Sequence, residues 1–207
     1  MQIQIYILAI VILIFSIVVH EVMHGYIAYR LGDNTAKFMG RLTLNPITHI
    51  DLLGTIIIPL LLIVSRSPIL FGWAKPVPVN FNNLHNPKRD SVYVALAGPA
   101  SNFVLAIIFT IFYHLFSFFP LLATAFWYGV YINLILGIFN LIPIPPLDGG
   151  RIAVGLLPWK YSCMLERLEP FGLYIVIVLL FLGFFNFTVF PLVEYLSRLL
   201  IGGSFYG

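Results

Sequence analysis

The sequence of 207 residues contains a single cysteine, Cys163, and very little charge. One cysteine excludes a disulfide bond within the chain and a metal site built from several thiolates. Charged residues make up only 9% of the sequence, whereas soluble domains average about 25%. Hydrophobic residues make up 60%, and the mean hydropathy is +1.00. This composition excludes an ordinary soluble domain and indicates an integral membrane protein.

Positive charge is also sparse, and the formal net charge is only +3. The Lys and Arg residues lie in short loops between apolar runs and do not gather in one block. This distribution is typical of residues that orient a protein in the lipid bilayer, and it argues against a nucleic-acid partner. No loop is long enough to fold alone, so we expect residues 1–207 to form a single transmembrane domain.

The apolar runs predict an all-α polytopic membrane protein, because about 20 apolar residues cross a bilayer as a helix. Long runs cover residues 3–30, 92–119, 121–142 and 173–193. A shorter run, 50–64, is interrupted by Gly54 and Pro59, so it either crosses the membrane or re-enters it. The first run lacks a basic segment and a cleavage site, so we expect a retained helix. The total is about five to six transmembrane or re-entrant segments.

Basic residues at the ends of these runs predict their orientation, because short cytoplasmic loops are enriched in Lys and Arg. Run 3–30 is followed by basic residues, run 92–119 is preceded by them, and run 121–142 is followed by them. These residues are Arg30, Lys37, Arg41, Lys88, Arg89, Arg151, Lys160 and Arg167. The first run is therefore expected to pass from outside to inside, and run 121–142 is expected to end inside.

The stretch "SPILFGWAKPVPVNFNNLHNPKRD", residues 67–90, differs from the apolar runs. Its prolines forbid a continuous helix. Within it, "AKPVPVNF" (74–81) predicts an extended or edge-strand piece, so the fold should contain a small β-like element.

The first apolar run contains "HEVMH", in which His20, Glu21 and His24 match H-E-x-x-H. Residues four apart on a helix share one face, about 6 Å apart along the axis, so both imidazoles can bind one metal ion. Glu21 flanks that face, where a carboxylate can take a proton from water that zinc has acidified. Such a short motif also occurs by chance, but a charged residue at the bilayer centre costs at least about 2.5 kcal/mol, which favours the metal site.

Catalytic zinc usually has three protein ligands and one open position, so a third ligand is expected. The remaining His and Asp residues are His49, His85, His114, Asp33, Asp51, Asp90 and Asp148. Asp148 is favoured because the prolines of "NLIPIPPLDGGR" (140–151) end a helix on the inner side, and His20 lies towards the inner end of its own run. The alternative for Asp148 is an ordinary Asp-Gly turn.

Three blocks of the sequence resemble the site-2 protease family of intramembrane zinc metalloproteases, in its compact bacterial and archaeal form. They are "VVHEVMHGYIAYRLGD" (18–33), "ALAGPASNFVLA" (95–106) and "FNLIPIPPLDGGR" (139–151), and "FGWAKPVPVN" (71–80) is similar to a loop of the compact subgroup. We expect neither the PDZ insertion nor the nucleotide-binding module that some relatives carry.

The resemblance implies that His20, His24 and Asp148 hold Zn²⁺ and that Glu21 is the general base. It implies hydrolysis of peptide bonds within or next to transmembrane segments of protein substrates, in regulated intramembrane proteolysis by one transmembrane metalloprotease domain. The expected location is the cell (inner) membrane of a bacterium or archaeon, with the active site towards the cytoplasmic side.

Two asparagines near the inner ends of their runs, Asn102 and Asn140, could donate to an oxyanion or hold an extended substrate backbone. The alternative for each is a hydrogen bond between helices. The edge of segment 74–81 could likewise pair with an extended substrate, in which case further prolines there should lower cleavage and leave zinc content unchanged.

Two other classes of protein fit the same metal ligands. One is a divalent-metal transporter that uses them as a transit site, and the other is a non-catalytic metal-binding membrane scaffold. Glu21 separates these classes from a hydrolase, because neither transport nor scaffolding requires a base beside the ligands.

Overall fold

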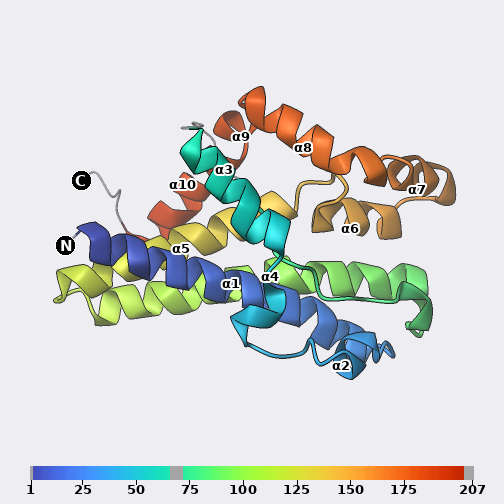
Figure 1. The fold of residues 1–207 in the computed structure, drawn as a ribbon, viewed down its shortest axis with the longest axis horizontal. Helices are drawn as coiled ribbons and strands as arrows, with labels where there is room; N and C mark the ends of the chain where they lie inside the picture. The colour runs from blue at the N-terminus through green and yellow to red at the C-terminus, as the bar shows by residue number, and fades with distance from the viewer. Residues whose placement is uncertain (1, 66–71, 203–207) are drawn as a thin grey trace.

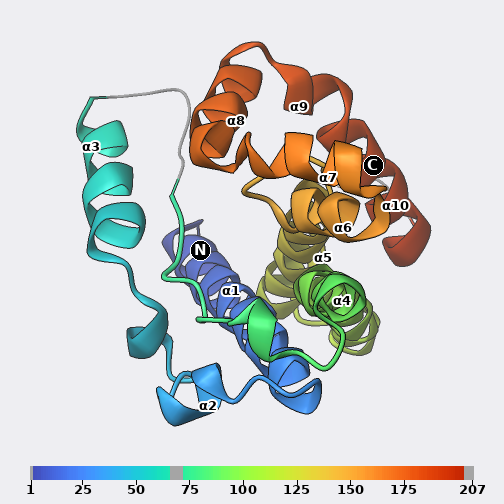
Figure 2. The ribbon, with the colours of Figure 1, turned by 90° about the vertical axis from the view of Figure 1, so that its right-hand side faces the viewer.

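Three long helices form the centre of the molecule. The computed structural model describes residues 2–65 and 72–202. Its long helices are α1 (Gln2–Arg30), α4 (Pro87–Leu115) and α5 (Pro120–Asn140), which pack against one another in pairs (Figure 1 and Figure 2). Pro87 and Pro120 each begin their helix, where the missing N–H group has no partner to lose.

Four stretches of the described residues are long and apolar enough to cross a membrane, which supports an all-α integral membrane protein. They are Ile3–Arg30, Pro87–Leu115, Pro120–Asn140 and Phe184–Ile201. The first three confirm the predicted runs at 3–30, 92–119 and 121–142. The predicted total of five to six segments is not confirmed.

A buried apolar core lies where α4, α5 and α10 (Val189–Ile201) meet. Its members include Leu105, Ala106, Phe109, Val130, Leu134, Val189 and Val193. Close packing of this kind resists displacement of one helix against another. The core therefore fixes the relative positions of α4 and α5, which both contribute to the site described below.

The prediction of one continuous span at 173–193 is wrong. The chain instead forms α8 (Gly172–Phe181), α9 (Phe184–Phe187) and α10, with a turn between α8 and α9. Gly183 takes a left-handed conformation there, with φ of 70°, which ends a helix at little cost because glycine has no Cβ. Apolar composition does not reveal such a stop, and the last apolar stretch consequently starts eleven residues later than predicted, at Phe184.

The short apolar run at 50–64 is helical but is not among the four long stretches. It forms η2 (Leu52–Ile57) and α3 (Ile58–Val64). Asp51 caps its start, with Oδ1 accepting a hydrogen bond from the Gly54 N–H at 2.7 Å. Trp73 contacts the same helical turn, because its backbone N–H donates to the Gly54 carbonyl at 3.1 Å.

The segment predicted to be strand-like is extended but pairs with no strand, and the described residues contain no β-strand. Pro76 and Pro78 have no N–H group, so a regular ladder cannot form. The Lys75 N–H donates to the His49 carbonyl at 2.9 Å, and the Asn80 N–H donates to Asp33 Oδ2 at 2.7 Å. The segment is therefore held by loops and side chains.

Shorter helices complete the structure, and one of them begins at Asp148. They are α2 (Thr35–Phe38), η1 (Pro46–His49), η3 (Phe81–Asn83), α6 (Asp148–Leu156), α7 (Trp159–Glu166) and η4 (Glu169–Phe171). Of these, α6 packs against α4 and begins at Asp148.

Candidate active site

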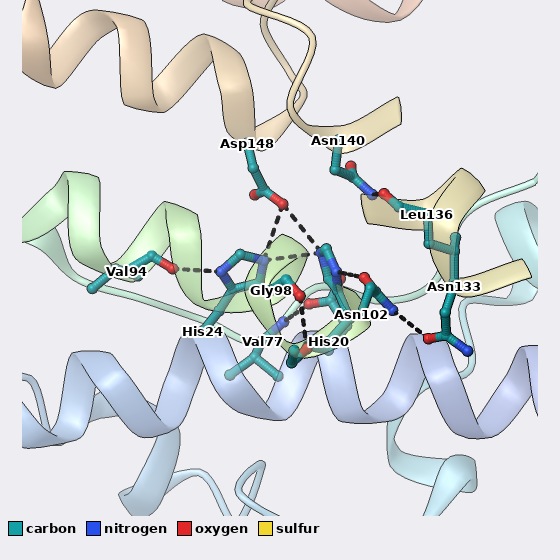
Figure 3. Close-up of polar contacts among 12 residues, drawn as sticks. His20, His24, Val77, Val94, Gly98, Asn102, Asn133, Leu136, Asn140 and Asp148 are labelled. Atoms are coloured by element: carbon teal, nitrogen blue, oxygen red, sulfur yellow. Dashed lines mark hydrogen bonds and ion pairs between the residues drawn. The ribbon is translucent and has the colours of Figure 1, made fainter. Parts of the chain in front are cut away.

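Helix α1 places His20 and His24 one turn apart on the face that meets α4 (Figure 3). Their Nε2 atoms lie 3.0 Å from each other. Nδ1 of His24 lies 2.7 Å from the Val94 carbonyl oxygen, which can only accept a hydrogen bond. In the neutral ring, Nδ1 therefore carries the proton, and Nε2 keeps a lone pair directed at its neighbour.

His20 is oriented in the same way by a chain of buried amides. Its Nδ1 lies 2.6 Å from Asn102 Oδ1, and Asn102 Nδ2 donates to Asn133 Oδ1 at 3.0 Å. Asn133 Nδ2 in turn donates to Ser16 Oγ at 2.8 Å, so the chain joins α4 to α5 and returns to α1. The Asn102, Asn133 and Ser16 side chains are fully buried.

Asp148 reaches the two imidazoles from the start of α6 (Figure 3). Its Oδ2 atom lies 3.1 Å from His20 Nε2 and 3.3 Å from His24 Nε2. That oxygen is enclosed and has no further hydrogen-bond partner among the described residues. Burial alone would raise the pKa of Asp148, but hydrogen bonds and charge from protonated His20 and His24 rings lower the pKa to about 2. With neutral rings, a metal cation between the same atoms would favour the carboxylate in the same way.

These three donor atoms fit a metal ion. Two neutral Nε2 lone pairs and one carboxylate oxygen at 3.0–3.3 Å repel one another unless a cation or protons lie between them. Donors around tetrahedral zinc, each about 2.0–2.2 Å from the ion, lie roughly 3.3 Å apart. His20, His24 and Asp148 are also the group of described residues whose ligand atoms could hold an ion together.

Gly98 lets α4 approach the two imidazoles closely. A Cβ atom at this position would lie 2.6 Å from Cε1 and Nε2 of His20, and closer still to Nε2 of His24. No side chain can be accommodated there without moving a ring, because real Cβ atoms do not approach other atoms so closely.

Glu21 is partly buried and lies on α1 between the two histidines in sequence. Its Oε2 atom accepts a hydrogen bond from the Val77 N–H at 2.9 Å. The extended segment that follows Lys75 therefore passes directly over this carboxylate.

The two predicted asparagines are placed differently. Asn102 is fully buried and makes the predicted alternative, a hydrogen bond between helices. Asn140 is partly buried near the end of α5, where Nδ2 donates to the Leu136 carbonyl at 2.9 Å. Sequence reasoning missed Asn133 and Ser16. The signal for Asn133 was an amide inside an apolar run, where polar side chains usually bond to another helix.

The other His and Asp candidates do not join the group of three within the part of the chain that the structure describes. Several are engaged in loops and caps. His49 Nε2 lies 2.9 Å from the Thr43 carbonyl oxygen, Asp90 Oδ2 accepts from the Asn86 N–H at 2.8 Å, and Asp51 caps η2.

Helices long and apolar enough to cross a membrane, together with a His–His–Asp group that could hold a metal ion, indicate an integral membrane protein with a candidate metal site. Comparison with known families identifies it further, because the model of "Peptidase family M50" matches residues 8–128 and 120–183. The chain belongs to this family, the site-2 protease family of zinc metallopeptidases, as the resemblance predicted.

Curated relatives agree with this assignment. YwhC of Bacillus subtilis is 38% identical over 194 residues, covering 89% of this chain and 85% of the relative. Rip2 of Mycolicibacterium smegmatis is 31% identical over 194 residues, covering 91% and 72%. Both carry the description "Putative zinc metalloprotease". The "Zinc metalloprotease MJ0392" of Methanocaldococcus jannaschii is 29% identical over 156 residues, covering 73% and 35%. No solved structure matches the chain significantly.

Proposed function

We propose that this zinc metallopeptidase hydrolyses peptide bonds within or next to the transmembrane segments of other membrane proteins, in regulated intramembrane proteolysis. The observation that carries the proposal is the convergence of His20, His24 and Asp148 between helices long and apolar enough to cross a bilayer. A site enclosed by such helices meets its substrates in the membrane. Residues 1–207 would act as one transmembrane metalloprotease domain.

In this proposal His20, His24 and Asp148 hold the zinc ion. Bound zinc supplies a Lewis acid that polarises the carbonyl of the scissile bond. The Glu21 carboxylate acts as the general base, accepting a proton from the attacking water and passing it to the leaving amine. Asn140 is the better placed of the two asparagines to contact an oxyanion or a substrate backbone, since Asn102 is fully buried and already bonds to His20.

We further propose that the protein lies in the cell (inner) membrane of a bacterium or archaeon, with its active site towards the cytoplasm. The basic residues that follow α1 and α5 support this orientation, because cytoplasmic loops are enriched in Lys and Arg. The His20–His24 pair lies in the same half of α1 as Arg30, so the site shares that side.

Cleavage in proteoliposomes tests the function directly. We expect the purified protein to cut a model single-span substrate inside or next to its span, with the fragments identified by mass spectrometry. Removal of zinc with a chelator should abolish cleavage, and one equivalent of zinc should restore it. Zinc uptake into the same liposomes, without any cleavage, would instead favour a metal transporter.

Gly98→Ala is expected to lower zinc affinity about tenfold or more, a loss like that caused by removing a residue that orients a ligand. The added Cβ would displace one or both imidazoles. Zinc affinity is measured by competition with a chelator of known strength. Gly137→Ala is the matched control, because its Cβ would press on the Phe103 ring at 3.1 Å and not on a ligand. Equal zinc affinity in a folded Gly98→Ala protein would show that the imidazoles do not depend on this contact.

A further inference from the structure

The extended segment 75–80 lies against α1 at the position of the proposed base. Its Val77 N–H donates to Glu21 Oε2 at 2.9 Å, and the Val77 side chain is only 6% exposed. Gly25 makes this approach possible, since a Cβ there would lie 2.6 Å from Val77 Cγ1 and 2.8 Å from Leu42 Cδ2. Pro76 and Pro78 offer no N–H group, so Val77 supplies the only backbone donor between residues 76 and 78.

Arg41 binds the same segment through the two carbonyl groups that precede the Val77 N–H. Its Nη2 atom donates to the Lys75 carbonyl at 2.9 Å and to the Pro76 carbonyl at 3.3 Å. Arg41 is only 8% exposed and forms no ion pair with a described carboxylate. A buried guanidinium normally requires an acidic partner, but Arg41 Nη2 donates to two carbonyls and Nε has no hydrogen-bond partner among the described residues. The Nη2 contacts therefore fix the backbone and do not balance a negative charge.

The ends of the segment are anchored independently. The Lys75 N–H donates to the His49 carbonyl, and the Asn80 N–H donates to Asp33 Oδ2. Burial raises the pKa of Asp33, but hydrogen bonds from Thr35, Asn83 and the Asn80 backbone lower it below its usual value. Arg41 therefore acts between two fixed points, on the peptide unit that reaches Glu21, through its Pro76 carbonyl, and on the peptide unit before it.

We propose that Arg41 is a positioning residue of the reaction, which acts through the carbonyls of Lys75 and Pro76 to aim the Val77 N–H at the Glu21 carboxylate. One oxygen of that carboxylate is then fixed by a hydrogen bond, and the other is left to accept the proton from water. A base that is free to rotate loses this orientation, and a misplacement of about 1 Å can lower the rate roughly 100-fold. The inference rests on the proposed function, because it concerns the base of that reaction.

Four variants test the proposal in the zinc-loaded protein: Arg41→Gln, Val77→Pro, Val77→Ala and the double variant Arg41→Gln/Val77→Pro. We expect Arg41→Gln and Val77→Pro each to lower kcat about tenfold or more, with KM changed by less than about twofold and zinc content unchanged. Val77→Ala keeps the N–H group and should retain most of kcat. Arg89→Gln, at an exposed arginine beside Tyr93, is the matched control and should leave kcat unchanged.

The double variant separates positioning from a general structural effect. If Arg41 acts through the Val77 N–H, removing both costs no more than removing one, whereas two unrelated defects multiply. Multiplying losses, a wild-type kcat in Arg41→Gln, or equal losses in Val77→Ala and Val77→Pro would each overturn the proposal. If Arg41→Gln does not fold, the comparison of kcat in Val77→Pro and Val77→Ala shows whether the Val77 N–H group orients Glu21.

A second proline variant distinguishes this role from pairing of the segment with substrate. Val79→Pro removes a neighbouring N–H group that donates no hydrogen bond to Glu21, which accepts from Val77, so kcat should stay near the wild-type level. A loss as large as that of Val77→Pro, accompanied by a higher KM, would favour substrate pairing and reject the positioning role.

Amide hydrogen exchange provides a readout that needs no cleavage. Arg41→Gln should speed exchange in a peptide covering residues 75–80 at least about tenfold, in both zinc-free and zinc-loaded protein, because the backbone loses its anchor. Unchanged exchange would contradict the proposal. A wild-type protein that cleaves no membrane substrate would refute the proposed function instead, and this exchange difference would still be measurable.

Discussion

Replacing Glu21 by glutamine is expected to abolish cleavage of a transmembrane substrate while leaving one zinc ion per chain. The amide has nearly the shape of the carboxylate and can still accept the Val77 N–H, so the local structure should persist. It cannot take a proton from water at neutral pH, and loss of a general base lowers rates by about 10²–10⁴-fold. The measurements are kcat/KM in proteoliposomes and zinc per chain by elemental analysis.

Glu194→Gln is the matched control for this substitution. Glu194 pairs with Arg198 on the exposed side of α10, so its replacement should leave both cleavage and zinc content unchanged. Wild-type cleavage by Glu21→Gln would remove the general base from the mechanism. Loss of zinc from the same variant would show that Glu21 contributes to metal binding, which the proposed ligand set does not include.

The second large effect concerns zinc binding itself. His20→Ala and Asp148→Ala are each expected to lower zinc affinity by more than about 100-fold, because even the loss of an outer residue that orients a ligand costs 10–100-fold. Cleavage should disappear in parallel. Elemental analysis of the purified variants, followed by competition with a chelator, gives the remaining affinity.

His114→Ala serves as the control, since this histidine lies on the exposed end of α4, near the Leu200 carbonyl. It should retain zinc and activity. Full zinc occupancy in Asp148→Ala would mean that the third ligand lies elsewhere, and the convergence of Asp148 with the two imidazoles would then have another role.

Several features of this site could be predicted because they depend on local rules. The spacing of His20 and His24 places both rings on one helical face, whatever surrounds the helix. Asp148 was predicted from two independent arguments, the prolines that end a helix before it and the charges that place that end on the inner side. The apolar runs at 3–30, 92–119 and 121–142 likewise follow from length and composition alone.

Two other features, the run at 173–193 and the segment 74–81, could not be predicted fully, because local sequence signals conflict there. The run at 173–193 reads as one span by hydropathy, but Gly183 ends a helix inside it, and a glycine within an apolar run does not by itself reveal whether the chain continues or turns. The segment 74–81 was expected to be an extended or edge-strand piece, but it contains no strand and its last residue, Phe81, begins η3. Its partners were not predictable, because prolines remove its regular ladder and leave isolated donors that only the folded chain can place.

The sequence by itself determined three of the long apolar helices and the paired histidines with their neighbouring carboxylate, because these are set by composition and by spacing along one helix. It also determined the family, because three motif blocks along the chain carry the resemblance. Only the tertiary structure decided that Asn133 and Ser16 support His20, and that Arg41 and Val77 reach Glu21. Those contacts join residues far apart in the chain, and their geometry depends on how α1, α4 and α5 pack and on the path of the segment between them.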